Sequence, residues 1–313
     1  MKKPRKEMWD VDFSVELGDL VLKNPILAAS GTYGYGRELN NIIRTDDFGG
    51  LCTKSITPLA RDGNEPPRIA DVRMGMLNSI GLANVGVKVF IKEKIPFLQS
   101  LETNVIVNVA GFSIEDYVTV IHLLEEIEGI DGYEINISCP NVEGGLEFGS
   151  SSKSAAKLTK SLRAETNRFL MVKLSPNVTD ISGIAVAVEG EGANAVSLIN
   201  TLIGMGIDIQ SEKPILKNRF GGYSGPGIKP IALAMVHQVY HSIKIPIVGI
   251  GGIMTAEDVI QFMLAGATAV QLGTVNFLNP TALTEILEDL VAIAESKGIR
   301  NVSDFIGRLK EWD

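Results

Sequence analysis

Short apolar runs alternate with amphipathic stretches along the whole chain. The apolar runs have the length of buried strands, whereas the amphipathic stretches repeat their apolar residues with a helical period. Strands are therefore predicted at 26–30, 50–54, 104–109, 133–138, 170–174, 195–199, 247–251 and 269–272. Helices are predicted at 114–126, 155–166, 231–241 and 256–264. Start signals occur at Ser113, at Thr255, and at Asn279 followed by Pro280.

This series of eight strand–helix units predicts an α/β fold. Continuous apolar strands are typical of a parallel sheet that is covered on both faces. Eight units favour closure of that sheet into a (β/α)8 TIM barrel. An open doubly wound sheet is the alternative, although it usually has fewer repeats. No linker divides the chain, so residues 1–313 are expected to form a single domain.

Three segments depart from the repeat. Residues 12–24, with Gly18-Asp19 at their centre, predict an N-terminal β-hairpin at the floor of the barrel. Residues 56–85 and 201–229 are long connections, and both follow predicted strands. We expect these long loops on the C-terminal face, where barrel enzymes carry their chemistry.

Composition and charge narrow the possible partners. The 313 residues carry a formal net charge of -8, which argues against nucleic acid as the main partner. Two cysteines cannot form a disulfide framework or ligate an iron–sulfur cluster. The charged N-terminus has no apolar run behind it, and no run approaches the length of a membrane span. We therefore expect a cytoplasmic protein.

The histidines do not predict a metal site. His237 and His241 are spaced i, i+4 on a predicted outer helix, but neither they nor His122 has a third ligand nearby. We interpret them as solvated helix residues and predict no metal.

Two glycine-containing turns predict a phosphate site. Gly251-Gly252 and Gly273-Thr274 end the last two predicted strands, where barrels frequently bind phosphate. Glycine lets backbone N–H groups approach an anion closely. The alternative is ordinary turn chemistry.

Two lysines lie at predicted strand ends, Lys54 and Lys173. A buried cation needs an anionic partner, either an internal carboxylate or a ligand. Few acids share the strand ends, which favours an anionic ligand.

Asparagines gather in the same places, at Asn78, Asn108, Asn136, Asn141 and Asn200. Singly each is a turn residue, but together they suit a planar ligand with amide or imide groups. Cys139 lies among them, after a strand and before a proline, whereas Cys52 is interpreted as a buried apolar residue. The glycine-rich segment that follows Cys139 is a candidate lid.

The chain resembles the dihydroorotate dehydrogenases, in particular the FMN-bearing catalytic subunit of the class 1B enzymes. Six stretches carry the resemblance in order: KSITPLARDGNEPPR, GMLNSIGLAN, NISCPNV, VKLSPN, SGPGIKPIAL and GGIMTAEDVIQFMLAGATAVQLGT. The basic residues 1–10 lie outside the pattern and are expected to form a flexible arm.

The resemblance implies roles for individual residues. It implies FMN binding by Ser30, Lys54, Ser55, Asn108, Asn136, Lys173, Ile199, Gly225, Gly251, Gly252, Gly273 and Thr274. It implies dihydroorotate binding by Lys54, Asn78, Ser79, Ile80, Gly81, Leu82, Asn136, Asn141, Asn200 and Thr201. Cys139 is implied as the catalytic base, and Lys173 as the cation that stabilises charge on reduced flavin.

The implied reaction is oxidation of (S)-dihydroorotate to orotate in the de novo synthesis of pyrimidines (UMP). The resemblance also implies NAD as final acceptor and a partner subunit that carries FAD and a [2Fe-2S] cluster. A homodimer of this chain would form the core of a heterotetramer.

Four other functions are alternatives to this one. They are a class 1A enzyme that uses fumarate, a dihydropyrimidine dehydrogenase subunit, a non-catalytic flavin-binding sensor barrel, and a tRNA dihydrouridine synthase. SGPGIKP favours class 1B, the intact Cys139 disfavours the sensor, and the acidic balance disfavours the synthase.

Overall fold

The computed structural model describes residues 11–138, 148–310 and 312. Eight parallel strands form a closed barrel in the order β3, β4, β7, β8, β9, β10, β15, β16. Their bounds are Ile26–Ala28, Gly50–Cys52, Asn104–Val109, Gly132–Asn136, Phe169–Lys173, Ala195–Leu198, Ile247–Ile250 and Ala269–Leu272. All eight predicted strands and the predicted TIM barrel are confirmed.

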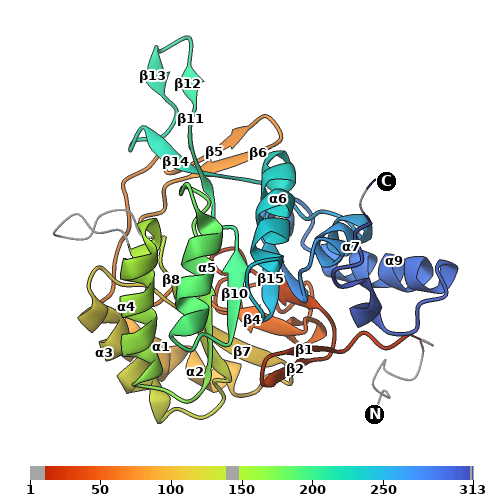
Figure 1. The fold of residues 1–313 in the computed structure, drawn as a ribbon. Helices are drawn as coiled ribbons and strands as arrows, with labels where there is room; N and C mark the ends of the chain where they lie inside the picture. The colour runs from red at the N-terminus through yellow and green to blue at the C-terminus, as the bar shows by residue number, and fades with distance from the viewer. Residues whose placement is uncertain (1–10, 139–147, 311, 313) are drawn as a thin grey trace.

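Helices surround the barrel (Figure 1). They are α1 Val87–Glu93, α2 Ile95–Leu98, α3 Ile114–Glu125, α4 Ser152–Arg163, α5 Ile181–Gly190, α6 Lys229–Tyr240, α7 Ala256–Leu264, α8 Val275–Leu278 and α9 Ala282–Ser296. Short 3-10 helices lie at Thr45–Asp47, Phe148–Ser150, Pro226–Ile228 and Val302–Phe305. No helix of the described residues is long and apolar enough to cross a membrane.

Two of the three predicted helix starts are confirmed, and the third is wrong. Ser113 caps α3 by accepting a hydrogen bond from the backbone N–H of Asp116, and Thr255 begins α7 with a complete capping box. The start at Asn279 is wrong, because α9 begins at Ala282. Asn279 instead ends α8, and its side-chain oxygen accepts from the N–H of Thr281.

The first of the eight predicted strand–helix units also differs. Residues 29–49, all described, contain no α-helix and reach β4 through turns and the 3-10 helix at Thr45–Asp47. Gly31, Gly34 and Gly36 all have positive φ in this segment, a conformation that cannot continue a right-handed helix.

The predicted N-terminal hairpin is confirmed. Strands β1 (Val15–Leu17) and β2 (Leu20–Leu22) pair antiparallel across Gly18 and Asp19. Gly18 lies against Phe169 at the start of β9, and Asn104 at the start of β7 donates to the carbonyl of Val21 at 3.0 Å. The hairpin therefore covers the N-terminal end of the barrel.

The two long connections form a sheet that the sequence did not predict. Strands β5 (Ile69–Val72) and β6 (Gly75–Asn78) come from the first, and β11 (Leu202–Met205) and β14 (Phe220–Ser224) from the second. They make one antiparallel sheet in the order β11-β14-β6-β5, at the end of the barrel opposite the hairpin (Figure 1). The small pair β12 (Ile207–Asp208) and β13 (Lys213–Pro214) projects beyond it.

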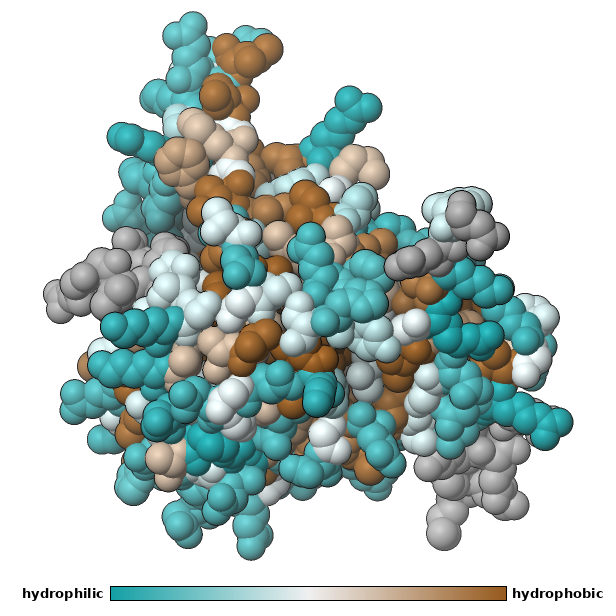
Figure 2. All heavy atoms as spheres, in the orientation of Figure 1, coloured by the Kyte–Doolittle hydropathy of each residue, from teal (hydrophilic) through white to brown (hydrophobic). Residues whose placement is uncertain are grey.

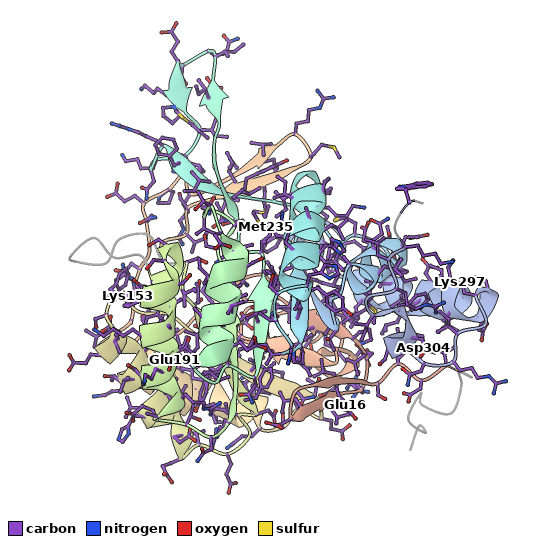
Figure 3. All side chains as sticks on the ribbon, in the orientation of Figure 1. Glu16, Lys153, Glu191, Met235, Lys297 and Asp304 are labelled. Atoms are coloured by element: carbon purple, nitrogen blue, oxygen red, sulfur yellow. The ribbon has the colours of Figure 1, made fainter. Side chains whose placement is uncertain are left out.

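Most residues of the barrel strands are apolar, and most charged side chains lie at the surface of the molecule. Strands β3, β4, β9, β10, β15 and β16 are buried along their whole length. The charged side chains labelled in Figure 3, such as Glu16, Lys153, Lys297 and Asp304, lie at the periphery. We call residues 202–224, which contain β11 to β14, the projecting sheet. It is the exception, because apolar side chains gather over it (Figure 2). Among its exposed residues are Ile203, Ile207, Ile209 and Phe220.

Candidate active site

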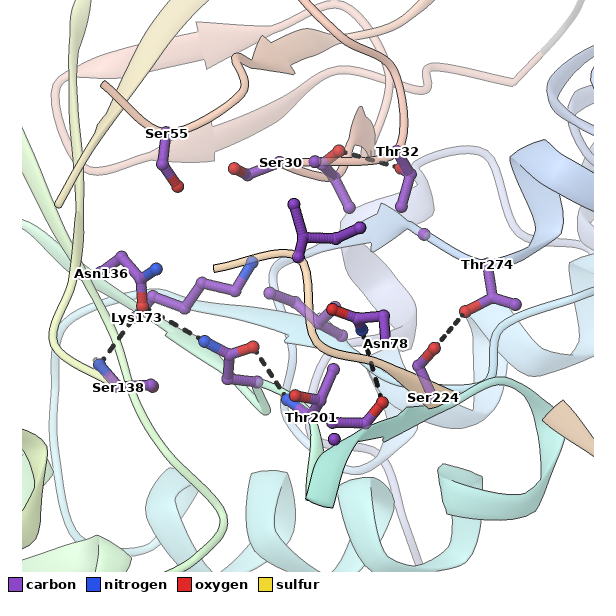
Figure 4. Close-up of a pocket in the computed structure, with 18 of the residues that line it drawn as sticks. Ser30, Thr32, Ser55, Asn78, Asn136, Ser138, Lys173, Thr201, Ser224 and Thr274 are labelled. Carbon is purple, nitrogen blue, oxygen red and sulfur yellow. Dashed lines mark hydrogen bonds between the residues drawn. The ribbon is translucent and has the colours of Figure 1, made fainter. Parts of the chain in front are cut away.

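A cavity of about 970 Å³ opens at the C-terminal ends of the barrel strands, beneath the four-stranded sheet. This is the size range of sites that bind cofactors and small substrates. Its walls come from the loops that follow the barrel strands, and strands β6 and β14 contribute Met76, Asn78 and Ser224 from the sheet (Figure 4).

Every predicted site residue that the structure describes lines this one cavity. They are Ser30, Lys54, Ser55, Asn78, Ser79, Ile80, Gly81, Leu82, Asn108, Asn136, Lys173, Ile199, Asn200, Thr201, Gly225, Gly251, Gly252, Gly273 and Thr274. Cys139 and Asn141, with most of the candidate lid, lie outside the described residues, as does the predicted arm at 1–10.

One wall of the cavity is built of glycine. Gly251 and Gly252 follow β15 with φ of 131° and 74°, and Gly273 follows β16. A Cβ on Gly252 would lie 2.8 Å from the carbonyl oxygen of Gly225, which belongs to the loop before α6. The chains approach each other so closely here that only glycine fits, and the backbone itself faces the cavity.

Amide side chains form a connected group on the opposite side. The Asn136 side-chain oxygen accepts from the backbone N–H of Ser138 and from the amide of Asn200, each at 3.2 Å. Asn200 in turn accepts from the N–H of Thr201 at 2.8 Å (Figure 4). These bonds fix the orientation of both amides while leaving them further donors and acceptors for a ligand.

The loop at 78–82 is held in an unusual conformation. Leu82 has φ of 56°, a left-handed conformation that is rare for a residue with a side chain. A Cβ on Gly81 would lie 2.6 Å from the Asn64 side chain, whose amide donates to the carbonyl of Ser79 at 2.9 Å. Strain of this kind is characteristic of functional sites.

Lys54 is a cation without an anionic partner. Within the described residues no carboxylate lies within ion-pair distance of its ammonium. Burial, and to a lesser degree the neighbouring charge of Arg68, lowers the pKa of Lys54 below its ordinary value. The binding of an anionic ligand by Lys54 stays a prediction.

Lys173 has a different environment from the one predicted. Its ammonium lies 3.7 Å from a carboxylate oxygen of Glu134, so the internal ion pair that the sequence disfavoured is present. Glu134 is completely buried in the middle of β8, and the sequence analysis missed it. The signal was a single acid between the apolar residues Tyr133 and Ile135 of the strand. Lys173 still lines the cavity and points into it (Figure 4).

Asn177 is a second residue that the sequence analysis missed, and it lines the cavity. It follows β9, donates to the carbonyl of Thr201 at 3.0 Å, and accepts from the N–H of Ile203 at 2.9 Å. Its position just past a strand matched the other asparagines and was the available signal. It ties the sheet to the barrel at the edge of the cavity.

The remaining candidate residues lie away from this chemistry. Cys52 is completely buried, as predicted, and burial followed by the charge of Glu134 raises the pKa of its thiol well above the ordinary value. His241 is exposed, but His237 is half-buried, with its ring centroid 4.6 Å from that of His241. The interpretation as solvated is therefore wrong for His237, because α6 turns it toward the molecule. The described residues contain no cluster of three metal-ligating side chains.

Comparison with known proteins now identifies the family. A family model described as Dihydroorotate dehydrogenase matches residues 13–293, which include the whole barrel and every predicted site residue. The chain belongs to the dihydroorotate dehydrogenase family.

Members of the dihydroorotate dehydrogenase family resemble the chain along almost its full length. It is 47% identical over 300 residues to a protein of Caldicellulosiruptor bescii, with 96% of this chain and 99% of the relative covered. It is 48% identical over 303 residues to one of Geotalea uraniireducens, with the same coverage. Both relatives are named Dihydroorotate dehydrogenase B (NAD(+)), catalytic subunit.

A more distant dihydroorotate dehydrogenase shares the fold. The crystal structure of DHODH in complex with ferulenol from Eimeria tenella superimposes with a TM-score of 0.81 at 23% identity. The alignment covers 95% of this chain and 88% of that one.

Proposed function

We propose that this chain oxidises dihydroorotate to orotate in pyrimidine biosynthesis, as the FMN-dependent catalytic subunit of an NAD-linked enzyme. The family assignment and the names of the relatives support the reaction. The single observation that carries the site is that one cavity collects every described residue to which the family pattern gives a role.

The cavity residues fit FMN. The glycine wall at Gly225, Gly252 and Gly273 offers backbone without side chains, which suits the phosphate. Ser55 and Asn108, joined by a hydrogen bond of 2.5 Å, with Lys173 supply polar contacts for the ring. Bound FMN supplies the hydride acceptor.

The substrate has a matching set of groups. Dihydroorotate carries a carboxylate, for which the ammonium of Lys54, unpaired among the described residues, is the partner. Its ring carries imide and amide groups, for which Asn78, Asn136 and Asn200 supply both donors and acceptors. Asn141 belongs to the same proposed set but lies outside the described residues.

Cys139 is proposed as the general base. It takes a proton from C5 of dihydroorotate while a hydride leaves C6. Cys139 directly follows Ser138, which lines the cavity. It lies three residues after Asn136, the cross-strand partner of Lys173 at the end of β8. This position in the chain, rather than any geometry of the thiol, supports the role.

A partner subunit is proposed to take the electrons onward to NAD through an iron–sulfur cluster and FAD. The relatives' names include both NAD(+) and "catalytic subunit". The chain's two cysteines are too few for a cluster. The exposed apolar residues of the projecting sheet are typical of protein–protein interfaces, which supports an assembly of several subunits.

The test is anaerobic mixing of the FMN-loaded chain with dihydroorotate. We expect bleaching of the flavin absorbance and formation of orotate in equal amount. A chain that binds FMN but is not reduced would be a flavin-binding sensor, and one reduced by dihydrouracil in preference would be a dihydropyrimidine dehydrogenase subunit. Either result would overturn the proposal.

A further inference from the structure

A polar cluster occupies the interior of the barrel beneath the cavity. The completely buried Glu134 lies at its centre, and TIM barrels ordinarily fill this space with branched apolar side chains. Its carboxylate accepts from Asn108 at 2.6 Å, from Gln271 at 2.7 Å and from Ser197 at 2.8 Å, and it pairs with Lys173 at 3.7 Å.

All four contacts present donors to the carboxylate. An ionised carboxylate accepts only, so this environment satisfies the charged form of Glu134. Lys173 is itself 6% exposed, and Glu134 is the one acid within ion-pair distance of it among the described residues. The two buried charges therefore depend on each other.

Glu134 does not line the cavity, whereas two of its partners do. Lys173 points into the cavity from the end of β9 (Figure 4). Asn108 uses its amide nitrogen on Glu134, which leaves its oxygen to accept from Ser55. One carboxylate thus pairs with the ammonium of Lys173 and sets the orientation of Asn108.

We propose that Glu134 is a positioning residue that supplies the counter-charge of Lys173, and holds Asn108 in a single orientation, at the floor of the cavity. This rests on the proposed function to the extent that FMN is the group above them. Without the carboxylate, the buried ammonium has no counter-charge and no carboxylate partner to hold it in place. The stabilisation that this cation offers to charge on reduced FMN is then weakened.

The first experiment needs no FMN. Thermal unfolding of the apo-protein is compared for wild type, E134Q, K173M and the double variant, with S197A as the control that removes one donor and no charge. We expect E134Q and K173M each to lower the Tm, and the double variant to lower it by clearly less than their sum. Additive losses would overturn the pairing.

The second experiment measures the midpoint potential of bound FMN. We expect E134Q and K173M both to lower it, the double variant to lower it no further than K173M, and S197A to leave it near the wild-type value. A raised potential in E134Q would mean that Lys173 stabilises charge on reduced FMN without Glu134, and would overturn the proposal.

The two experiments separate the possible failures. If the Tm values couple but the wild-type chain binds no FMN, the proposed function fails while the ion pair stands. If FMN binds and is reduced by dihydroorotate but the potentials do not couple, the proposed function stands and the role of Glu134 is refuted.

Discussion

At the residue scale, the glycines that line one wall of the cavity give a direct prediction about cofactor binding. Gly252 has φ of 74°, and a side chain there would meet Gly225 and Lys229. Gly252→Val is therefore expected to abolish most FMN binding, measured as flavin content after purification and reconstitution. Gly190→Val is the matched control, because a Cβ at Gly190 meets nothing within 4 Å. A fully flavinated Gly252→Val protein would contradict the phosphate site.

Cys139 is tested by removing its thiol. Loss of a general base slows the step that it serves by about 10²–10⁴-fold. Cys139→Ala is expected to bind FMN normally and to slow flavin reduction by dihydroorotate by that factor, measured by anaerobic stopped flow. Cys52→Ala is the control, since that thiol is buried beneath the cavity and does not line it. Reduction of Cys139→Ala at the wild-type rate would rule out its role as base.

Lys54 predicts a pH dependence of ligand binding. Its pKa is lowered from the ordinary value of 10.5, so the ammonium loses its proton at a lower pH than a free lysine does. An anionic ligand needs the ammonium, and its affinity should therefore fall as the pH rises through this lowered pKa. Calorimetric titration with orotate measures the effect.

A substitution at Lys54 measures how much its ammonium contributes to orotate binding. Lys54→Met should weaken orotate binding by about 10- to 100-fold at neutral pH. It should also remove the fall in orotate affinity at alkaline pH. Lys92→Met replaces an exposed lysine on α1 and serves as control. If Lys54→Met keeps the same pH profile as wild type, a different group binds the carboxylate.

At the element scale, helix α7 anchors the loop that follows β15. Asp258 accepts from the N–H groups of Met254 and Thr255 and pairs with Lys229 of α6. The capping box of Thr255 and Asp258 thus orders the segment directly after Gly251 and Gly252.

This cap gives a stability prediction. Thr255→Ala is expected to cost about 0.5–2 kcal/mol in the free energy of unfolding, measured by urea denaturation. Thr281→Ala should cost less, because Thr281 precedes α9 without a side-chain capping bond. Equal losses in both variants would show that the cap of α7 adds no stability of its own.

At the scale of the whole molecule, the proposed division of cofactors between this chain and a partner subunit predicts which reactions the isolated chain can carry out. The chain is expected to reduce its FMN with dihydroorotate and to pass electrons to artificial acceptors, yet to reduce NAD negligibly. Addition of the proposed partner subunit, which would carry the iron–sulfur cluster and FAD, should restore NAD reduction, which is followed by NADH absorbance. Efficient NAD reduction by the chain alone, or preferential turnover with fumarate, would contradict the class while leaving the dihydroorotate chemistry standing.

The sequence by itself determined the barrel and most of the cavity. Strands buried on both faces must be apolar along their length, so each barrel strand was visible as a local run. The carboxyl ends of parallel strands share one face, and residues just past them, such as Lys54, Asn200 and Gly252, could be assigned to one site without knowing the register.

Tertiary structure decided what depends on contacts between distant residues. Strand β6 pairs with β14 across more than a hundred residues, and neither strand has an apolar pattern strong enough to indicate the sheet by itself. The partner of Lys173 was decided in the same way, because only the parallel pairing of β8 with β9 brings Glu134 beside it. Local patterns report burial, whereas pairing is a property of the folded chain.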